Sequence, residues 1–277
     1  MNSLNLLKNK KNIYSQNGED GVIEEIFKQL NITNGSCCEF GAWDGIHFSN
    51  TRNLILNGWT SIQIEYDPKK FELLKKTYEN NKKVYRINTY IDDGDNSIEK
   101  TFLKNGLENY IALDFLSIDV DGLDYWIMEK MGIKPNVICI EVNAAHNPLE
   151  EKMIPREISK NNIGQSLKVF TNLAEKMGYA LVCYTGNAFF IKKDILEKTQ
   201  IPILDTVTAY ENFLFTLSKE EKERLFFVNL GMINTPSYKF NNPFLSRNNL
   251  NLSILIIIYN VVILILRKII SVINPKK

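Results

Sequence analysis

Short apolar segments alternate with amphipathic helical patterns through residues 14–194, and this alternation limits the fold more than any other feature. We expect strands at residues 36–40, 61–66, 83–88, 115–120 and 137–142. Helices are expected at residues 21–30, 49–57, 68–80, 97–105, 124–131 and 165–177, with Asp20 and Ser49 capping the first two. Two further strands, at 179–184 and 188–192, should form a hairpin. This order predicts an α/β fold with a mainly parallel, doubly wound sheet, to which the hairpin adds an antiparallel edge.

The composition excludes several classes of protein. The chain has 277 residues, of which 44% are hydrophobic and 23% charged, as is typical of a globular protein rather than a disordered one. A formal net charge of +1 provides no overall field, so we expect no nucleic-acid partner. The four cysteines lie in apolar segments without metal-binding spacing, which indicates buried thiols in a reducing compartment. No apolar stretch follows the basic N-terminal residues, so a cytoplasmic location is expected.

The C-terminal residues differ in kind from the rest of the chain. Residues 252–266 are uncharged and read LSILIIIYNVVILIL, and a basic pair and a second apolar run follow them. As a helix this run would be about 22 Å long, shorter than the roughly 30 Å hydrocarbon core of a bilayer. We therefore expect a hydrophobic helix that lies in, or partly enters, the inner face of the membrane, with its basic end at anionic headgroups. An oligomerisation helix and a helix packed on the body are the alternatives.

The predicted organisation has three parts. Residues 1–196 form the α/β domain, residues 197–250 a helical and loop extension, and residues 251–274 the membrane-associating helix. Within the extension a charged helix is expected at 218–226. The loop at 143–162, with much of the extension, should shape a substrate pocket.

Acidic and polar residues follow each predicted parallel strand. In a doubly wound sheet, ligands bind where the carboxyl ends of the parallel strands meet. A pocket rimmed by acids favours a ligand that carries positive charge and hydroxyl groups. The residues are Glu39, Gly41, Asp44 and His47 after the first strand, Glu65 and Asp67 after the second, Asp92, Asp93 and Asp95 after the third, Asp119 and Asp121 after the fourth, and Glu141, Asn143 and His146 after the fifth.

The loop after the first strand is the most informative of these segments. Gly41 and Gly45 allow the backbone to approach a ligand closely. Glu65 stands where an acid accepts hydrogen bonds from ribose hydroxyls. The loop lacks the third glycine of a dinucleotide-binding motif, and it has Glu39 and Asp44 where a pyrophosphate favours bare amides. S-adenosylmethionine, with a sulfonium, an ammonium and a ribose but no phosphate, fits such a loop.

A series of short motifs extends over roughly residues 14–194. They read SQNGED at 15–20, EFGAWDGIH at 39–47, SNT at 49–51, GW at 58–59, IE at 64–65, LSIDVDG at 116–122, GQSL at 164–167, GY at 178–179 and NAFF at 187–190. In order and spacing they resemble the motifs of class I S-adenosylmethionine-dependent methyltransferases, and more narrowly those of the FkbM-like group.

The resemblance implies a Rossmann-like sheet of seven strands, bound S-adenosylmethionine, and methyl transfer to oxygen on a sugar or glycan-type acceptor. It also implies where the cofactor lies. Glu39, Gly41 and Asp44, with Gly45, would line its methionine end, Glu65 its ribose, and Asp92 or Asp93 its adenine, while Gln16 would close over the site. The sequence has Asp121 where many members of the group have a glutamate, so the acceptor stays open.

Methyl transfer to a hydroxyl requires a base that removes its proton. His146 is the first candidate, because an imidazole titrates near neutrality. Asp119, at the end of the fourth strand, is the second candidate, and His47 is the third. Asp119 and Asp121 together have three interpretations: orientation of cofactor and acceptor, a divalent metal site, or solvated loop acids.

Two other functions stay open at this point. A metal-dependent glycosyltransferase would use Asp119 and Asp121 to hold a cation on a nucleotide-sugar diphosphate, although the acid-rich first loop would repel that diphosphate. A non-catalytic scaffold would keep the fold and recruit partners through the C-terminal helix. The acids and histidines also have simpler explanations, as residues of exposed turns.

Overall fold

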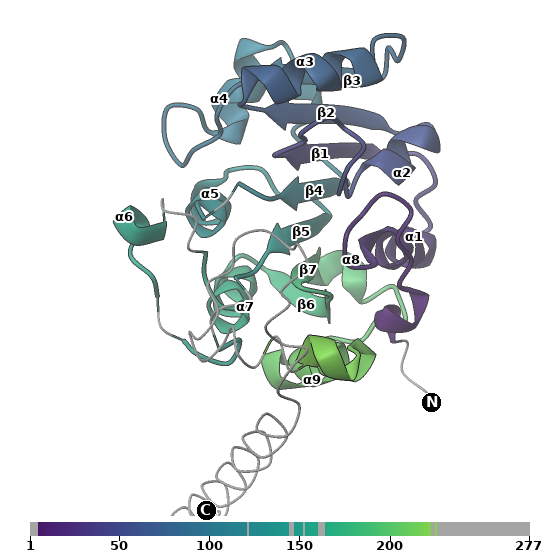
Figure 1. Cartoon of the computed structure of the whole chain (residues 1–277), viewed down its shortest axis with the longest axis vertical. Coiled ribbons are helices and arrows are strands. Elements are labelled where there is room, and N and C mark those ends of the chain that lie inside the picture. The colour runs from purple at the N-terminus through teal and green to yellow at the C-terminus, as the bar shows by residue number, and fades with distance from the viewer. Residues whose placement is uncertain are drawn as a thin grey trace, which may run out of the picture. The chain divides into compact units, whose positions relative to one another are not determined.

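A computed structural model shows an α/β fold built on one seven-stranded mixed sheet (Figure 1). The structure describes residues 5–120, 122–143, 147–151, 153–159, 164–222 and 225, which all belong to one compact unit, Met1–Asn234. The strands are β1 (Ser36–Phe40), β2 (Thr60–Glu65), β3 (Val84–Asn88), β4 (Phe115–Ile118), β5 (Val137–Glu141), β6 (Tyr179–Tyr184) and β7 (Asn187–Lys192).

The sheet has the strand order β3-β2-β1-β4-β5-β7-β6. Neighbouring strands from β3 to β5 pair in parallel, and β7 is antiparallel to both β5 and β6. The seven strands and the C-terminal hairpin confirm the predicted doubly wound sheet. One detail differs: the antiparallel strand lies inside the sheet, and β6 is the edge. The order also reverses direction at β1, since β2 lies on one side of β1 and β4 on the other.

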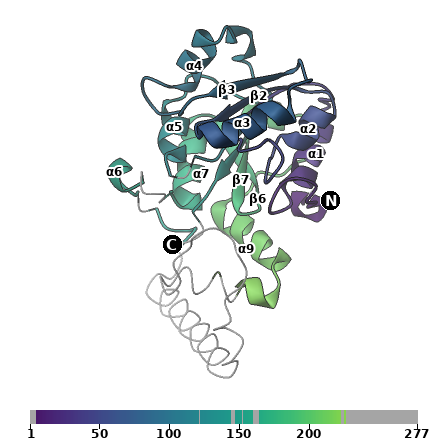
Figure 2. The same ribbon diagram turned by 45° about the horizontal axis from the view of Figure 1, so that its top comes forward.

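Helices cover both faces of this sheet (Figure 2). On one face lie α4, α5, α7 and α9, whose buried side chains form one core cluster, and on the other lie η1, α1, α2, α3 and α8 with a second cluster. The helices are η1 (Leu6–Asn9), α1 (Glu19–Gln29), α2 (Arg52–Leu56), α3 (Pro68–Thr77), α4 (Ile98–Lys104), η2 (Glu108–Tyr110), α5 (Asp124–Lys130), α6 (Arg156–Ser159), α7 (Leu167–Lys176), α8 (Lys193–Leu196) and α9 (Thr206–Thr216).

Two of the predicted helix caps are wrong. Helix α1 begins before Asp20, after Gly18 in the left-handed conformation, so Asp20 lies in the first turn. Its carboxylate instead accepts hydrogen bonds at 2.8 Å from the backbone N–H groups of residues 13–15. Helix α2 begins at Arg52 with Thr51 as its N-cap residue. The Ser49 hydroxyl still accepts the N–H of Arg52 at 3.0 Å, while it donates to the buried carboxylate of Glu39 on β1.

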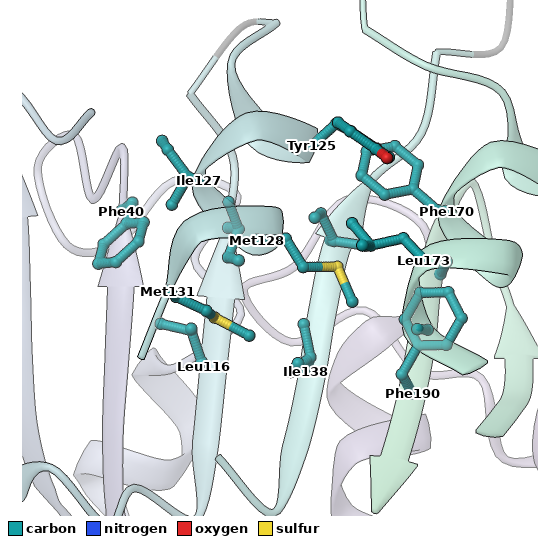
Figure 3. Packing of buried hydrophobic residues seen from close by; sticks show 14 of the residues in the cluster. Phe40, Leu116, Tyr125, Ile127, Met128, Met131, Ile138, Phe170, Leu173 and Phe190 are labelled. Carbon is teal, nitrogen blue, oxygen red and sulfur yellow. The ribbon is translucent and has the colours of Figure 1, made fainter. Parts of the chain in front are cut away.

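The core is apolar on both faces, as the continuous hydrophobic strands predict. Figure 3 shows how Met128 of α5 and Phe170 of α7 lie over the strands beside Ile138 of β5 and Phe190 of β7. All four cysteines are free and buried, as predicted.

The predicted extension at 197–250 contributes a helix that sequence reasoning left undefined. Helix α9 begins after Asp205, whose carboxylate caps it, and buries Ala209 and Phe213 against the first core cluster. The predicted membrane helix at 251–274 lies outside the described residues. Within the described part of the chain, every helix is too short or too polar to cross a bilayer.

Truncation of Phe190 should destabilise the fold strongly. Its side chain is fully buried, and it is paired with Ile138 on β5 and Leu181 on β6. We expect Phe190→Ala to lower the free energy of unfolding by about 3–5 kcal/mol, measured by chemical denaturation of the full chain. Leu103→Ala on α4 is the control, because that side chain is 63% exposed and its loss should cost little.

Candidate functional site

The reversal of strand order places the loop after β1 at the switch point of the sheet, where doubly wound folds bind ligands. Gly41 begins this loop with a φ of +69°, and a Cβ built there would lie 2.2 Å from the carbonyl oxygen of Asp119. Gly45 has a φ of +74°, and its Cβ would lie 2.4 Å from the ring of Tyr78. At both positions the packing of the chain itself leaves no room for a side chain. The close approach of a ligand to these glycines stays a prediction.

Glu39 is a buried carboxylate beneath this loop, and only 4% of its surface is exposed. One oxygen accepts hydrogen bonds from the hydroxyls of Ser49 and Thr51 at 2.7 and 2.6 Å, and the other from the N–H of Asn50 at 2.7 Å. Burial raises the pKa of Glu39, and these donors partly counter the rise. Glu39 therefore holds the 49–51 segment in place, while its predicted contact with a cofactor stays a prediction.

Glu65, at the end of β2, is also buried and connects two loops. One oxygen accepts the N–H of Trp43 at 2.9 Å, and the other accepts the N–H of Asp67 at 2.8 Å. Since a carboxylate offers about four acceptor positions, these two bonds leave capacity for hydroxyl donors. Glu65 therefore connects the β1 loop to the end of β2, and its predicted contact with a ribose stays a prediction.

Asp44 and His47 form a pair within the loop. Asp44 accepts hydrogen bonds from the N–H groups of Ile46 and His47, both at 2.9 Å, and its second oxygen lies 2.5 Å from His47 Nδ1. Partial burial raises the pKa of Asp44, but the hydrogen bonds from His47 and Ile46 outweigh it and hold that pKa below its usual value. Asp44 therefore provides a fixed negative charge at neutral pH, and the imidazole of His47 remains at the surface.

The same loop holds two aromatic residues in a strained conformation that sequence reasoning missed. Trp43 and Phe48 have φ values of +47° and +58°, although bulky residues rarely adopt the left-handed region. Both are exposed, with ring centres 6.2 Å apart, and Lys70 Nζ lies 4.9 Å from the centre of the Trp43 ring. Backbone strain of this kind is concentrated at functional sites in proteins. No residue pattern in the sequence indicates it.

The loop after β3 contains the acids predicted to lie near adenine. Asp92 accepts hydrogen bonds from the N–H groups of Gly94 and Asn96 at 2.8 and 2.9 Å, so it shapes the turn. Asp93 forms a two-point ion pair with Arg156 of α6, a residue that the sequence did not single out. The predicted adenine contact stays a prediction for both.

The end of β4 brings a further acid into the site. Asp119 is exposed there, and its carbonyl oxygen lies against Gly41. Asp124, which sequence reasoning passed over, is buried and accepts hydrogen bonds from the N–H groups of Val120 and Gly122 at 3.0 and 2.9 Å. An acid at the first position of a helix that follows a strand-end glycine is a recognisable signal for this role.

The remaining predicted site residues divide into two groups. His146 and Asp121, both catalytic candidates, lie outside the described residues. Gln16 is half-buried in the loop before α1, whose backbone Asp20 fixes. In the part of the chain that the structure describes, no group of three or more His, Cys, Asp and Glu side chains is placed to hold a metal ion.

Comparisons with known proteins add the following. No family model matches the chain, and no curated protein matches it. Similar solved structures include a TehB-like SAM-dependent methyltransferase from Corynebacterium glutamicum, with 14% identity, 68% of this chain and 92% of that chain covered, and a TM-score of 0.39. A candidate caffeoyl-CoA O-methyltransferase from Staphylococcus aureus is 16% identical to this chain. The match covers 67% of this chain and 87% of that chain, with a TM-score of 0.43. Identities and TM-scores this low assign no family to the chain.

Removal of the Thr51 hydroxyl should destabilise the protein in a pH-dependent way. Thr51→Val leaves Glu39 with one donor fewer, which should cost about 1–3 kcal/mol of unfolding free energy. The pKa of Glu39 is already raised, and losing this donor raises it further. The loss should therefore be smallest in acid, where Glu39 is protonated in both proteins, and grow as the pH rises through the two folded-state pKa values.

The measurement is the denaturation midpoint across a pH series. Thr171→Val is the matched control, because the Thr171 hydroxyl donates to a helical carbonyl and touches no titrating group. An equal pH dependence in the two variants would contradict the role of Glu39.

Proposed function

We propose that this protein is an S-adenosylmethionine-dependent O-methyltransferase whose acceptor is a sugar or lipid-linked glycan at the cytoplasmic face of a membrane. The observation that supports it most is the gathering of Asp44, Glu65 and Asp119 around the β1 loop at the switch point of the sheet. Fixed negative charge at that position favours a cationic nucleoside over a diphosphate.

The residues present fit the proposed cofactor. Asp44 is ionised at neutral pH, and its hydrogen bonds lower its pKa further, so it matches an ammonium or sulfonium group. Glu65 keeps acceptor capacity for the ribose hydroxyls beside the loop it holds. The Asp92 turn would contact adenine, and Gln16 would lie over the methionine end.

The cofactor, when bound, supplies an activated methyl group on a good leaving group. The protein then has to align an acceptor hydroxyl and accept its proton. Asp119 is exposed at the end of β4, next to the Gly41 turn, and is the candidate base among the described residues. His146 remains the other candidate, from the sequence.

A sugar-type acceptor is supported by the exposed rings around the site. Trp43 is 38% and Phe48 55% exposed, and Tyr66 and Tyr90 are exposed in contact with each other. Flat aromatic faces match the apolar C–H faces of pyranose rings, and neighbouring carboxylates match their hydroxyls. Attachment to the membrane is supported by the uncharged run at 252–266 alone.

Binding measurements test the cofactor directly. We expect the full chain to bind S-adenosylmethionine and S-adenosylhomocysteine in calorimetric titrations, with nucleotide sugars and Mn²⁺ giving no saturable signal. Asp44→Asn should weaken S-adenosylmethionine binding about tenfold, because it removes the fixed charge. Glu175→Gln on α7, an exposed acid paired with Lys193, is the control and should bind normally. Tight nucleotide-sugar binding instead would favour the glycosyltransferase.

Activity measurements test the base. Asp119→Ala and His146→Ala should each be compared with the natural chain for methyl transfer to glycans extracted from cells that lack the gene. At least one variant should lose about 10²–10⁴-fold in turnover while cofactor affinity is kept. If both retain full turnover, this assignment of the base is wrong. Glycans from such cells should be lighter by one CH₂ group per lost methyl.

A further inference from the structure

Arg156 makes a long-range ion pair that no sequence pattern suggests. Its Nε lies 2.9 Å from Oδ2 of Asp93, and its Nη2 bonds to the other carboxylate oxygen, so the pair is bidentate. The two residues are 63 positions apart in the chain. Their side chains are 32% and 15% exposed, which places the pair partly out of solvent, where such geometry contributes more than a surface contact.

The topology shows where this pair must lie. Asp93 follows β3 and Arg156 follows β5, and β2, β1 and β4 lie between those strands. Four strand spacings separate β3 from β5 by about 19 Å. The two segments therefore have to leave their own strands and meet beyond the carboxyl ends of the strands between them. In both views α6 lies on the side of α5, away from α1 and α2 (Figures 1 and 2).

The neighbouring charges agree with this position. Burial raises the pKa of the Tyr90 hydroxyl, the negative charge of Asp92 raises it further, and Arg156 opposes them. Asp93 and Asp124 also act on the same hydroxyl. The carboxylates of Asp93 and Asp92 in turn raise the pKa of Arg156, so Arg156 lies beside the acids of the β3 loop.

The side chain of Gln165 holds the segment that contains α6, independently of the ion pair. The buried amide of Gln165 donates to the carbonyl of Ile154 at 2.8 Å and to the hydroxyl of Ser159 at 3.2 Å. Its oxygen accepts the N–H of Ile154 at 2.8 Å. An uncharged network thus holds the 153–159 segment near both of its ends, while the charged pair with Asp93 connects the middle of the segment to the β3 loop. The ion pair can therefore break while the two ends stay held.

We propose that Arg156 is a positioning residue that latches the 153–159 segment over the adenosine end of the cofactor, through Asp93. This inference rests on the proposed function, because it assumes that the cofactor lies at the ends of β1 to β3. The cofactor leaves only when the pair opens, so the pair sets the dissociation rate. The latch also connects the loop after β5, where the acceptor is expected, to the cofactor site.

The test is the dissociation rate of S-adenosylhomocysteine from the full chain, measured by surface plasmon resonance. Arg156→Gln and Asp93→Asn should each raise that rate about tenfold, since each leaves the pair unmade. The exchanged variant, with Asp93→Arg and Arg156→Asp together, should return the rate to within about threefold of the natural chain. Lys75→Gln, which breaks an exposed pair with Glu72 on α3, is the control and should not change the rate.

The salt dependence of the dissociation rate gives a second test. Raising the salt concentration should speed dissociation in the natural chain and have less effect in Arg156→Gln, because salt weakens a partly exposed ion pair. Unchanged rates in both single variants, or no rescue by the exchange, would overturn the latch while leaving the proposed function intact. A natural chain that binds neither S-adenosylmethionine nor S-adenosylhomocysteine would overturn both.

Discussion

A carboxylate buried inside a sheet is costly unless donors surround it, and Glu39 meets that condition with a single tripeptide. The same tripeptide reaches the neighbouring strands, because Gln63 of β2 donates to the Thr51 hydroxyl and Asn50 donates to Ser117 of β4. The chain between β1 and α2 is therefore fixed to three adjacent strands, β1, β2 and β4. The loop at residues 41–48, between β1 and this tripeptide, can adopt a strained conformation because both of its ends are held.

That strain is concentrated where charges are also fixed. Trp43 adopts a positive φ while its N–H is held by Glu65, and Asp44 fixes the next turn through two backbone N–H groups. A loop determined by this many bonds keeps its shape before any ligand arrives. Its negative charge is therefore organised in advance, which reduces the reorganisation that binding a cation would otherwise require.

The sheet could be predicted from the sequence because each strand is recognised from its own residues. Each strand is a short apolar run with a polar end, and parallel pairing then brings all these ends to one edge. Asp20 was misassigned for the opposite reason: its residue type favours caps, but here the backbone N–H groups of the preceding loop take its carboxylate. Ser49 does accept the N–H of Arg52, although Thr51 occupies the N-cap position. The positive φ of Trp43 and Phe48 is also set by tertiary contacts, and both residue types argue against it.

The pair between Asp93 and Arg156 marks the limit of sequence reasoning most clearly. An acid in a loop and an arginine in another loop are ordinary surface residues until the topology brings them together across three intervening strands. The acids at the carboxyl edge repel one another, and a cation among them lowers that repulsion whether it comes from a ligand or from the protein. Arg156 supplies such a cation from the protein, at the loop after β3. The acids Asp44 and Glu65 accept backbone N–H groups instead, so hydrogen bonds rather than a basic side chain of another loop hold these carboxylates in place.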